Sequence, residues 1–196
     1  NKKNYLNFGL GLLKKISKLT LDNDGFPKSR NIKQLIFYLK YFVLIREWFK
    51  ESQTTVPENI DETIYYLGQG YAFAWQNLDA DILFNGNNNS DNTNFDIYLK
   101  KLGYKFNNEN RDFGGYIILR NKKICLAMDA GSTPDQKYSK DYQSGALSFE
   151  IFSAGKKLIS NCGYYKKSNS KLNKLSKSSA AQNTLVIDDN LSLIHI

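Results

Sequence analysis

Apolar residues recur three or four positions apart through the first hundred residues, and this spacing predicts amphipathic helices. The predicted helices span residues 6–19, 31–51, 58–77 and 95–102. Ser29 is placed to cap the second helix, and Pro57 precedes the third, where a helix entry tolerates proline. An Asn-rich segment, 86–94, predicts a loop before the fourth helix. The N-terminal part is therefore expected to be helical over residues 1–105.

Beyond residues 106–114, the expected domain boundary, the pattern changes from helical to alternating, which is the period of a β-strand. Strands are predicted over residues 115–119, 123–128, 147–151, 157–160 and 184–187. In the third of these, every second residue from Leu147 to Ile151 is apolar and is expected to face the core. The short turn at 153–156 predicts a hairpin. The C-terminal part is therefore expected to be antiparallel and all-β.

The three long predicted helices are joined by loops short enough to make antiparallel neighbours. Such pairs are the unit of an α/α toroid, but three helices are too few to close one. The chain also starts at Asn1 rather than Met and stops at Ile196 inside apolar sequence. We therefore expect a piece of a longer protein, whose compartment is left open between bacterial periplasm and cytoplasm.

The chain carries a net charge of +8, and residues 156–177 hold seven lysines and no acid. Such a basic surface attracts uronate polysaccharides, nucleic acids or anionic lipids, and a solvated Lys-rich loop is the alternative. Nucleic acid is the weaker expectation, because only Tyr164 and Tyr165 interleave with these lysines. The longest apolar run, 35–45, is interrupted by Lys40, so no membrane span is expected.

Seven short segments carry a family resemblance. They read LDNDGFPKSRN (21–31), ILFNG (82–86), GGYIILRN (114–121), MDAGSTP (128–134), GALSFE (145–150), NCG (161–163) and SSAAQNTLVIDD (178–189). In this order they resemble motifs of heparinase II/III-like proteins, and the resemblance implies a polysaccharide lyase with a helical toroid followed by a β-sandwich. On this basis we expect an α+β multidomain protein, with the end of an incomplete α/α toroid over residues 1–105 and the start of an antiparallel β-sandwich over residues 113–196.

A lyase that cleaves a uronate chain by β-elimination must neutralise the sugar carboxylate, remove the C5 proton and protonate the leaving oxygen. The resemblance implies histidine and tyrosine for the proton transfers. This chain departs from that pattern, since Pro27, Gln143 and Gln182 stand where relatives carry histidine. Glutamine keeps a donor and an acceptor but does not titrate. Asn161 stands where an Asp of a metal site is common, so we expect no bound metal and no cofactor.

Six residues are the candidate site. The expected substrate-binding residues are Arg30, Asn31, Gln143 and Gln182, and the expected catalytic residues are Tyr142 and Tyr71. Arg30 lies at a predicted helix start, where an anion is favoured, and a salt bridge to Asp24 is the alternative. If catalysis is retained, a tyrosine must replace histidine, with Arg30 or a lysine lowering its pKa. Packing is the alternative for both tyrosines.

These observations favour a heparinase II/III-like protein that binds an acidic, uronate-containing polysaccharide. Cleavage by β-elimination stays open, because the histidines implied by the resemblance are replaced. A non-catalytic glycan-binding member of the family is the alternative. A basic nucleic-acid-binding protein is a third and weaker hypothesis.

Overall fold

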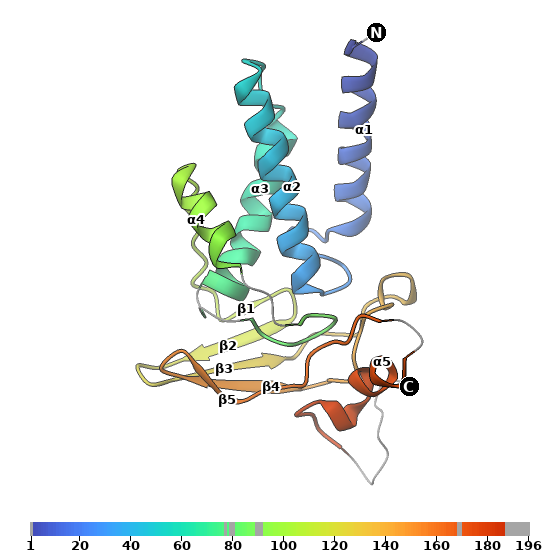
Figure 1. Cartoon of the computed structure of the whole chain (residues 1–196), viewed down its shortest axis with the longest axis vertical. Coiled ribbons are helices and arrows are strands. Elements are labelled where there is room, and N and C mark those ends of the chain that lie inside the picture. Colours follow the sequence, from blue (N-terminus) through green and yellow to red (C-terminus); the bar gives the residue numbers. More distant parts are fainter. Residues whose placement is uncertain (1, 77, 79–80, 89–91, 168–169, 187–196) are drawn as a thin grey trace.

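Helices and a β-sheet occupy separate parts of the computed structural model, which describes residues 2–76, 78, 81–88, 92–167 and 170–186 (Figure 1). The helical part contains α1 (Lys2–Thr20), α2 (Ile32–Glu51), α3 (Glu58–Tyr71) and α4 (Thr93–Lys101). A π-helical turn, Ala72–Gln76, continues α3. The four helices predicted from the apolar spacing are confirmed, with ends shifted by a few residues. Asn77, the predicted end of the third, lies outside the described residues.

The N-cap of α2 is Asn31 rather than Ser29. The Asn31 Oδ1 atom accepts hydrogen bonds from the backbone N–H groups of Lys33, at 2.9 Å, and Gln34, at 3.3 Å. A capping side chain reaches these groups only from the residue directly before the helix, and Ser29 lies too early. The Ser29 hydroxyl instead donates to the Gln34 side chain. The prediction of Ser29 as the cap is therefore wrong.

Helices α2 and α3 pack side by side, and their apolar stripes form the helical core. Ile32, Leu35 and Leu39 of α2 are fully buried, as are Ile60 and Leu67 of α3. Removing a large aliphatic side chain from water contributes about 1.5–3 kcal/mol, so this contact holds the helical part together. In the part of the chain that the structure describes, no helix is long and apolar enough to cross a membrane.

The sheet is antiparallel, and its strands lie side by side in the order of the sequence. The strands are β1 (Asp112–Phe113), β2 (Tyr116–Arg120), β3 (Ile124–Asp129), β4 (Phe149–Ser153) and β5 (Lys156–Ile159). The predicted hairpin, β4–β5, is confirmed, β2 and β3 form another hairpin, and the short β1 is an addition. Left-handed φ angles at Ala154 (48°) and Gly155 (72°) match the twist of a two-residue hairpin turn. The chain thus combines helices with an antiparallel sheet.

The buried face of β4 is opposite to the predicted one. Glu150 is fully buried and Phe152 is 3% exposed, whereas Leu147 is 47% exposed. Phe149 and Ile151 are half-buried. The apolar alternation predicts the wrong face because Phe152 joins the core shared with the helices, while hydrogen bonds compensate the burial of the Glu150 charge.

The two faces of the sheet differ in what covers them. One face joins the helical core through Tyr116, Ile118, Ala127 and Phe152. The other face is apolar, and its side chains are half-buried or exposed. We call it the outer apolar face, and it consists of Ile117, Leu119, Ile124, Leu126, Met128, Phe149, Ile151 and Ile159.

The segment after β5 folds differently from the prediction. A short helix, α5 (Lys171–Lys177), lies in the Lys-rich stretch, where no helix was predicted, and the Ser170 side chain caps it. Residues 184–186, the described part of the last predicted strand, form no strand. The Thr184 hydroxyl donates to the Ala146 carbonyl, so this segment lies against the loop before β4 without pairing in a ladder. Residues 187–196, with the only histidine, lie outside the described residues.

Candidate functional site

Arg30 ties the helical part to the sheet from a buried position. Its guanidinium donates to the backbone carbonyls of Gly114 (3.2 Å), Gly115 (2.8 Å) and Ser132 (3.1 Å). It also forms a 2.5 Å ion pair with Asp129. The partner of Arg30 is therefore Asp129, and the alternative of a salt bridge to Asp24 is wrong. Because every guanidinium nitrogen already has an acceptor, the structure gives Arg30 a positioning role.

Two further residues, Asn85 and Tyr116, complete this buried cluster. The Asn85 amide donates to Asp129 Oδ2 and to the Tyr116 hydroxyl, both at 2.8 Å, and the Tyr116 hydroxyl donates to the Arg30 carbonyl. Asn85 adopts a left-handed φ of 46°, which asparagine tolerates. Four of the segments that carry the family resemblance meet here. Each contributes one side chain to this hydrogen-bond network, which gives these residues a structural role. Sequence reasoning missed Asp129 and Tyr116, because each reads as an ordinary strand residue.

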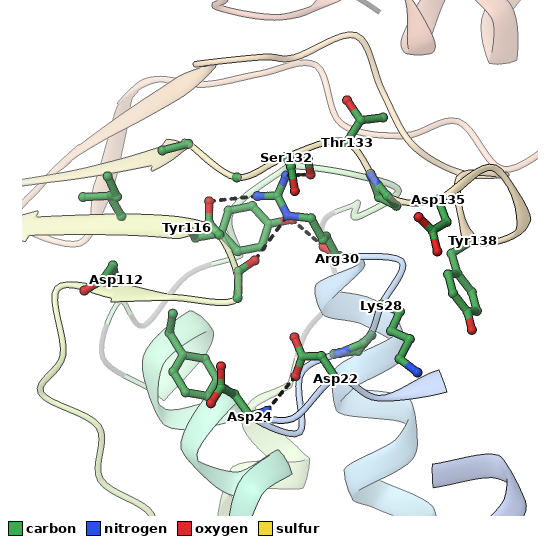
Figure 2. A pocket seen from close by; sticks show the side chains of 18 of the residues that line it. Asp22, Asp24, Lys28, Arg30, Asp112, Tyr116, Ser132, Thr133, Asp135 and Tyr138 are labelled. Atoms are coloured by element: carbon green, nitrogen blue, oxygen red, sulfur yellow. Dashed lines mark hydrogen bonds between the residues drawn. The ribbon is translucent and has the colours of Figure 1, made fainter. Parts of the chain in front are cut away.

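A cavity of about 880 Å³ opens beside this cluster, bordered by the loop before α2, by β1 and β2, and by the loop after β3 (Figure 2). The carboxylates on its rim belong to Asp22, Asp24, Asp112 and Asp135. Lys28 is the cation that faces them, since the Arg30 charge is already paired. We call this the Asp-rimmed cavity. Its negative rim repels a polyanion, so it suits an acidic polysaccharide poorly.

Tyr142 lies near the Arg30 cluster and is half-buried. Burial raises the pKa of Tyr142, and the Asp129 charge adds to this, while Arg30 and Thr133 offset the shift only in part. Arg30 thus acts on Tyr142 in the expected direction, but burial outweighs it and the pKa of Tyr142 stays above its ordinary value. A phenol of raised pKa stays protonated at neutral pH, which favours an acid over a base.

Gln143 is buried and cross-links three segments. Its Oε1 atom accepts from the Gly86 N–H at 3.1 Å, and its Nε2 atom donates to the carbonyls of Gly163 (3.2 Å) and Ser176 (2.6 Å). Gln182 is half-buried, and its Nε2 atom donates to the same Ser176 carbonyl at 3.2 Å. The structure therefore brings these two glutamines together, but neither lines the Asp-rimmed cavity.

Tyr71 lies inside the helical core. Its ring stacks on Trp75, with centroids 5.6 Å apart, and meets Phe95 edge-on. Burial raises the pKa of Tyr71 above its usual range, and the Asp96 carboxylate adds to the shift. Its ring is fully buried, so this placement supports packing rather than contact with a substrate.

A second cavity, of about 340 Å³, lies where several of the resembling segments meet, and we call it the Asn31 cavity. It is lined by Asn31, Lys33, Gln34, Phe37, Tyr38, Gly86, Asn88, Asp141, Tyr164 and Lys166. Asn31, Gly86 and Tyr164 come from or adjoin three of those segments. The six candidate residues do not share one cavity, since Arg30 lines the Asp-rimmed cavity and Asn31 lines this one.

The Asn31 cavity combines cations, amides and aromatic rings. Lys33 donates to the Asn88 side chain at 2.6 Å, and among the described residues no ion pair neutralises Lys33 or Lys166. The Tyr164 hydroxyl donates to Asp141 Oδ1 at 2.9 Å. Sequence reasoning missed these lining residues, although the Lys-rich stretch from 156 was the signal that pointed towards Lys166.

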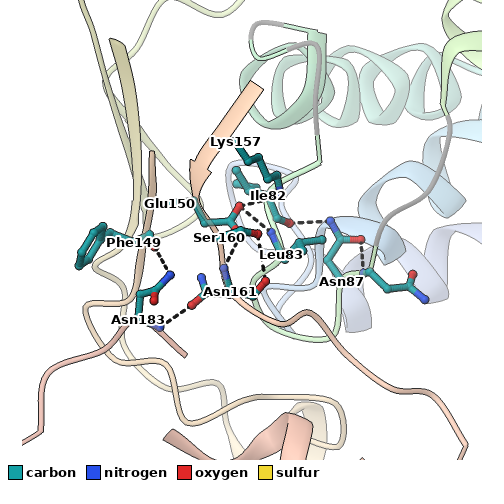
Figure 3. Close-up of polar contacts among 10 residues, drawn as sticks. Ile82, Leu83, Asn87, Phe149, Glu150, Lys157, Ser160, Asn161 and Asn183 are labelled. Carbon is teal, nitrogen blue, oxygen red and sulfur yellow. Dashed lines mark hydrogen bonds and ion pairs between the residues drawn. The ribbon is translucent and has the colours of Figure 1, made fainter. Parts of the chain in front are cut away.

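Glu150 joins the sheet to the segment that precedes the Asn31 cavity (Figure 3). Its carboxylate accepts hydrogen bonds from Leu83 N, Asn161 N, Lys157 Nζ and Ser160 Oγ, at 2.8–3.1 Å. Because four donors surround it, the buried charge is compensated. Among the described residues, no three His, Cys, Asp or Glu side chains gather to hold a metal ion. The expected absence of a metal stays a prediction.

Comparisons with known proteins agree with this arrangement. Residues 109–193 match the family model described as heparinase II/III-like, C-terminal. No curated protein sequence matches the chain. A crystal structure of heparinase III is similar, with a TM-score of 0.73 and 18% identity, over 95% of this chain and 35% of that one. Heparan sulfate lyase HepC from Pedobacter heparinus is similar with a TM-score of 0.72 and 14% identity, over 95% of this chain and 33% of that one.

At these identities the structural likeness shows the fold alone, and the chain spans about a third of the length of the two solved structures. The family model covers all five strands of the sheet and the segment that contains Gln143 and Gln182. Residues 109–193 therefore match the C-terminal part of heparinase II/III-like proteins, and the chain has the fold of a corresponding part of a solved heparinase III structure.

Proposed function

We propose that this protein binds an acidic, uronate-containing polysaccharide in the Asn31 cavity and cleaves it by β-elimination. The observation that carries the proposal is the convergence of Asn31 and Gly86, from two resembling segments, and Tyr164, which adjoins a third, on a cavity with two lysines that form no ion pair among the described residues. Ammonium groups and side-chain amides bind the carboxylates and hydroxyls of a sugar chain, and aromatic rings stack on sugar faces. The names of the similar solved structures, heparinase III and heparan sulfate lyase, support the same substrate class.

The finer architecture is part of this proposal. Helices α1 to α3 would be pairs of an α/α toroid, and the sheet would be one layer of a β-sandwich. The outer apolar face supports the second point, because a sheet buried on one side only leaves such side chains in water. A second sheet packed on this face would bury them.

The site residues predicted from the sequence take two roles in this proposal. Asn31 contacts the sugar, while Arg30, Gln143 and Gln182 hold the loops that shape the cavity. Tyr142 stays a candidate proton donor beside Arg30. The buried position of Tyr71 gives it no part in the chemistry.

Replacing the two cavity lysines tests the proposal. The full-length protein and the double variant Lys33→Gln/Lys166→Gln are titrated with heparan sulfate and polygalacturonate by calorimetry, and the unsaturated product is followed by its ultraviolet absorbance. Losing a charged hydrogen bond weakens binding by about tenfold or more. Lys123→Gln, in the exposed β2–β3 turn, is the matched control and keeps the wild-type affinity.

The outcomes separate the alternatives. Binding with product supports the lyase, and binding without product supports a non-catalytic glycan-binding protein. Equal affinity of wild type and double variant rules out the Asn31 cavity as the binding site. Binding to duplex DNA with a steep salt dependence, and to neither polysaccharide, favours the nucleic-acid hypothesis.

A further inference from the structure

We infer that Tyr164 and Asp141 form the proton-relay pair of the Asn31 cavity, with Tyr164 as the catalytic residue that exchanges protons with the sugar. This inference rests on the proposed function and assigns its chemistry to residues that the family resemblance does not implicate. Both side chains belong to residues that line the cavity, together with Lys33 and Lys166.

The position of Tyr164 is fixed from several sides. Its backbone N–H donates to the Asn87 carbonyl at 2.9 Å, and its hydroxyl donates to Asp141 Oδ1 at 2.9 Å. The Lys177 ammonium lies 5.7 Å from the centroid of its ring and donates to the Lys140 carbonyl at 2.6 Å. A reacting group held this way needs little reorganisation when a substrate arrives.

The surroundings decide which form of Tyr164 is present. Burial raises the pKa of Tyr164, and Asp141 adds to the rise, while a hydrogen bond from Asn173 opposes it. Lys177 over its ring is a further charge that faces it, and Lys33 and Lys166 line the same cavity. Tyr164 is therefore a phenol at neutral pH. It can act as a base only if its own proton moves away in the same step, and Asp141 already accepts that hydrogen bond.

Tyr164 and Asp141 together account for every proton transfer of the β-elimination. Lys33 or Lys166 holds the uronate carboxylate, which acidifies the C5 proton. The Tyr164 oxygen takes that proton while the phenolic proton passes to Asp141. The C5 electron pair forms the C4–C5 double bond, and the C4–O bond breaks with its electrons on the leaving oxygen. Tyr164 protonates the leaving oxygen and recovers its proton from Asp141, so both residues return to their starting state.

The other candidates are less well placed for this work. The family positions that carry histidine hold Gln143 and Gln182, which do not titrate. Tyr142 lies by the Arg30 cluster, and Tyr71 is in the helical core. Tyr164 is thus the tyrosine whose hydroxyl combines a carboxylate partner with a place in the Asn31 cavity.

Two conservative variants test the pair in the full-length protein: Tyr164→Phe, which keeps the ring, and Asp141→Asn, which keeps the shape. Heparan sulfate and polygalacturonate are the probes, with calorimetry for binding and ultraviolet absorbance for product. Loss of an acid–base group lowers kcat by about 10²- to 10⁴-fold. We expect this loss in Tyr164→Phe with an unchanged KM, and a smaller loss of kcat, again with an unchanged KM, in Asp141→Asn. Thermal unfolding checks that both variants are folded.

Tyr165→Phe and Tyr138→Phe are the controls, since Tyr165 is the exposed neighbour and Tyr138 lines the Asp-rimmed cavity. Both keep wild-type kcat if the inference holds. A wild-type protein that binds the probes and makes no product overturns the relay and leaves the binding function standing. Absence of binding overturns the proposed function itself, and the relay falls with it. Full activity in Tyr164→Phe overturns the relay alone.

Discussion

Gln143 and Gln182 show how single residues of this protein act as cross-links. Both donate to the Ser176 carbonyl, and Gln143 also reaches Gly86 and Gly163. Their amides carry no charge at any pH in the ordinary working range, so these links are insensitive to acid and base. Where histidine would titrate near neutral pH, this chain has a fixed hydrogen-bond pattern.

Removing the Gln143 side chain is expected to destabilise the protein strongly. Gln143→Ala leaves the buried Gly86 N–H and the Ser176 and Gly163 carbonyls short of partners, and each such loss costs about 1–3 kcal/mol. We expect the free energy of unfolding in urea to fall by about 3–5 kcal/mol in total. Gln182→Ala is the matched control, and the one hydrogen bond that its half-buried side chain donates within the described part of the chain predicts a loss of about 1 kcal/mol. Equal losses in the two variants contradict this difference in roles.

The sequence pointed to these residues, but not to what they do. The family resemblance marks Arg30, Asn31, Gln143 and Gln182 as special positions. The partners of Arg30 and Gln143 include backbone groups far along the chain, such as Gly86, 57 residues before Gln143. Spacing and residue type carry no information about contacts of this kind. Roles as ligand-binding groups and as cross-links are therefore indistinguishable without the fold.

Among the secondary-structure elements, the helices follow most directly from the local spacing of apolar residues. Their apolar spacing depends on neighbours within one or two turns, and it predicts α1 to α4 with small errors at the ends. The phase of β4 depends on distant groups instead. Glu150 can be buried only because Leu83 and Asn161 donate to it, and neither donor is visible in the alternation of the strand.

A polar cluster ties α2 to the segment after α4. Tyr104 donates to Glu47 at 2.8 Å, Lys50 lies 3.0 Å from the same carboxylate, and Arg46 pairs with Asp61 at 2.5 Å. Burial raises the pKa of Glu47, but the hydrogen bonds from Tyr104 and Lys50 outweigh it and lower the pKa overall. The ionised carboxylate is therefore the form that stabilises the folded state.

This lowered pKa predicts how stability depends on pH. A carboxyl whose folded pKa lies below its unfolded value stabilises the protein above the unfolded pKa, and the contribution is lost as pH falls through the folded pKa. We expect Glu47→Gln to lower the free energy of unfolding by about 1 kcal/mol at neutral pH. The difference from wild type should shrink below about pH 4. Denaturant titrations across this pH range measure it, with the exposed Glu62→Gln as control, and a difference that grows in acid contradicts the argument.

At the scale of the whole molecule, a few buried polar contacts connect the helical part to the sheet. Arg30 and Asn85, from segments beside the helices, bind Asp129 of the sheet. Conversely, the Glu150 carboxylate of the sheet accepts a hydrogen bond from the Leu83 backbone N–H of the helical part. The helices therefore hold the sheet through buried charges as well as through the shared apolar core. Such contacts fix orientation, because charge-assisted hydrogen bonds demand specific geometry.

Replacing Glu150 is expected to weaken this connection. Glu150→Gln puts an amide N–H₂ group among N–H, O–H and ammonium donors, so at least one donor loses its acceptor. Breaking a buried charge pair costs about 3–5 kcal/mol. We expect this loss in urea unfolding, together with faster hydrogen exchange of the Leu83 and Asn161 amides. Glu109→Gln, on the exposed surface, should change stability by less than about 0.5 kcal/mol, and protected amides in Glu150→Gln would refute the link.

The capping of α2 has a consequence for which molecules the Asn31 cavity accepts. The Asn31 oxygen is engaged by the N–H groups of Lys33 and Gln34, so only the hydrogens of its amide remain for a guest. A ligand atom that accepts hydrogen bonds, such as a carboxylate, hydroxyl or ring oxygen, can bond to this N–H₂ group. An ammonium group cannot, because both partners would be donors. The cap of α2 thereby makes the Asn31 cavity selective for ligand groups that accept hydrogen bonds. A flip of the Asn31 amide would allow it to bind a hydrogen-bond donor, but it would remove the N-cap of α2.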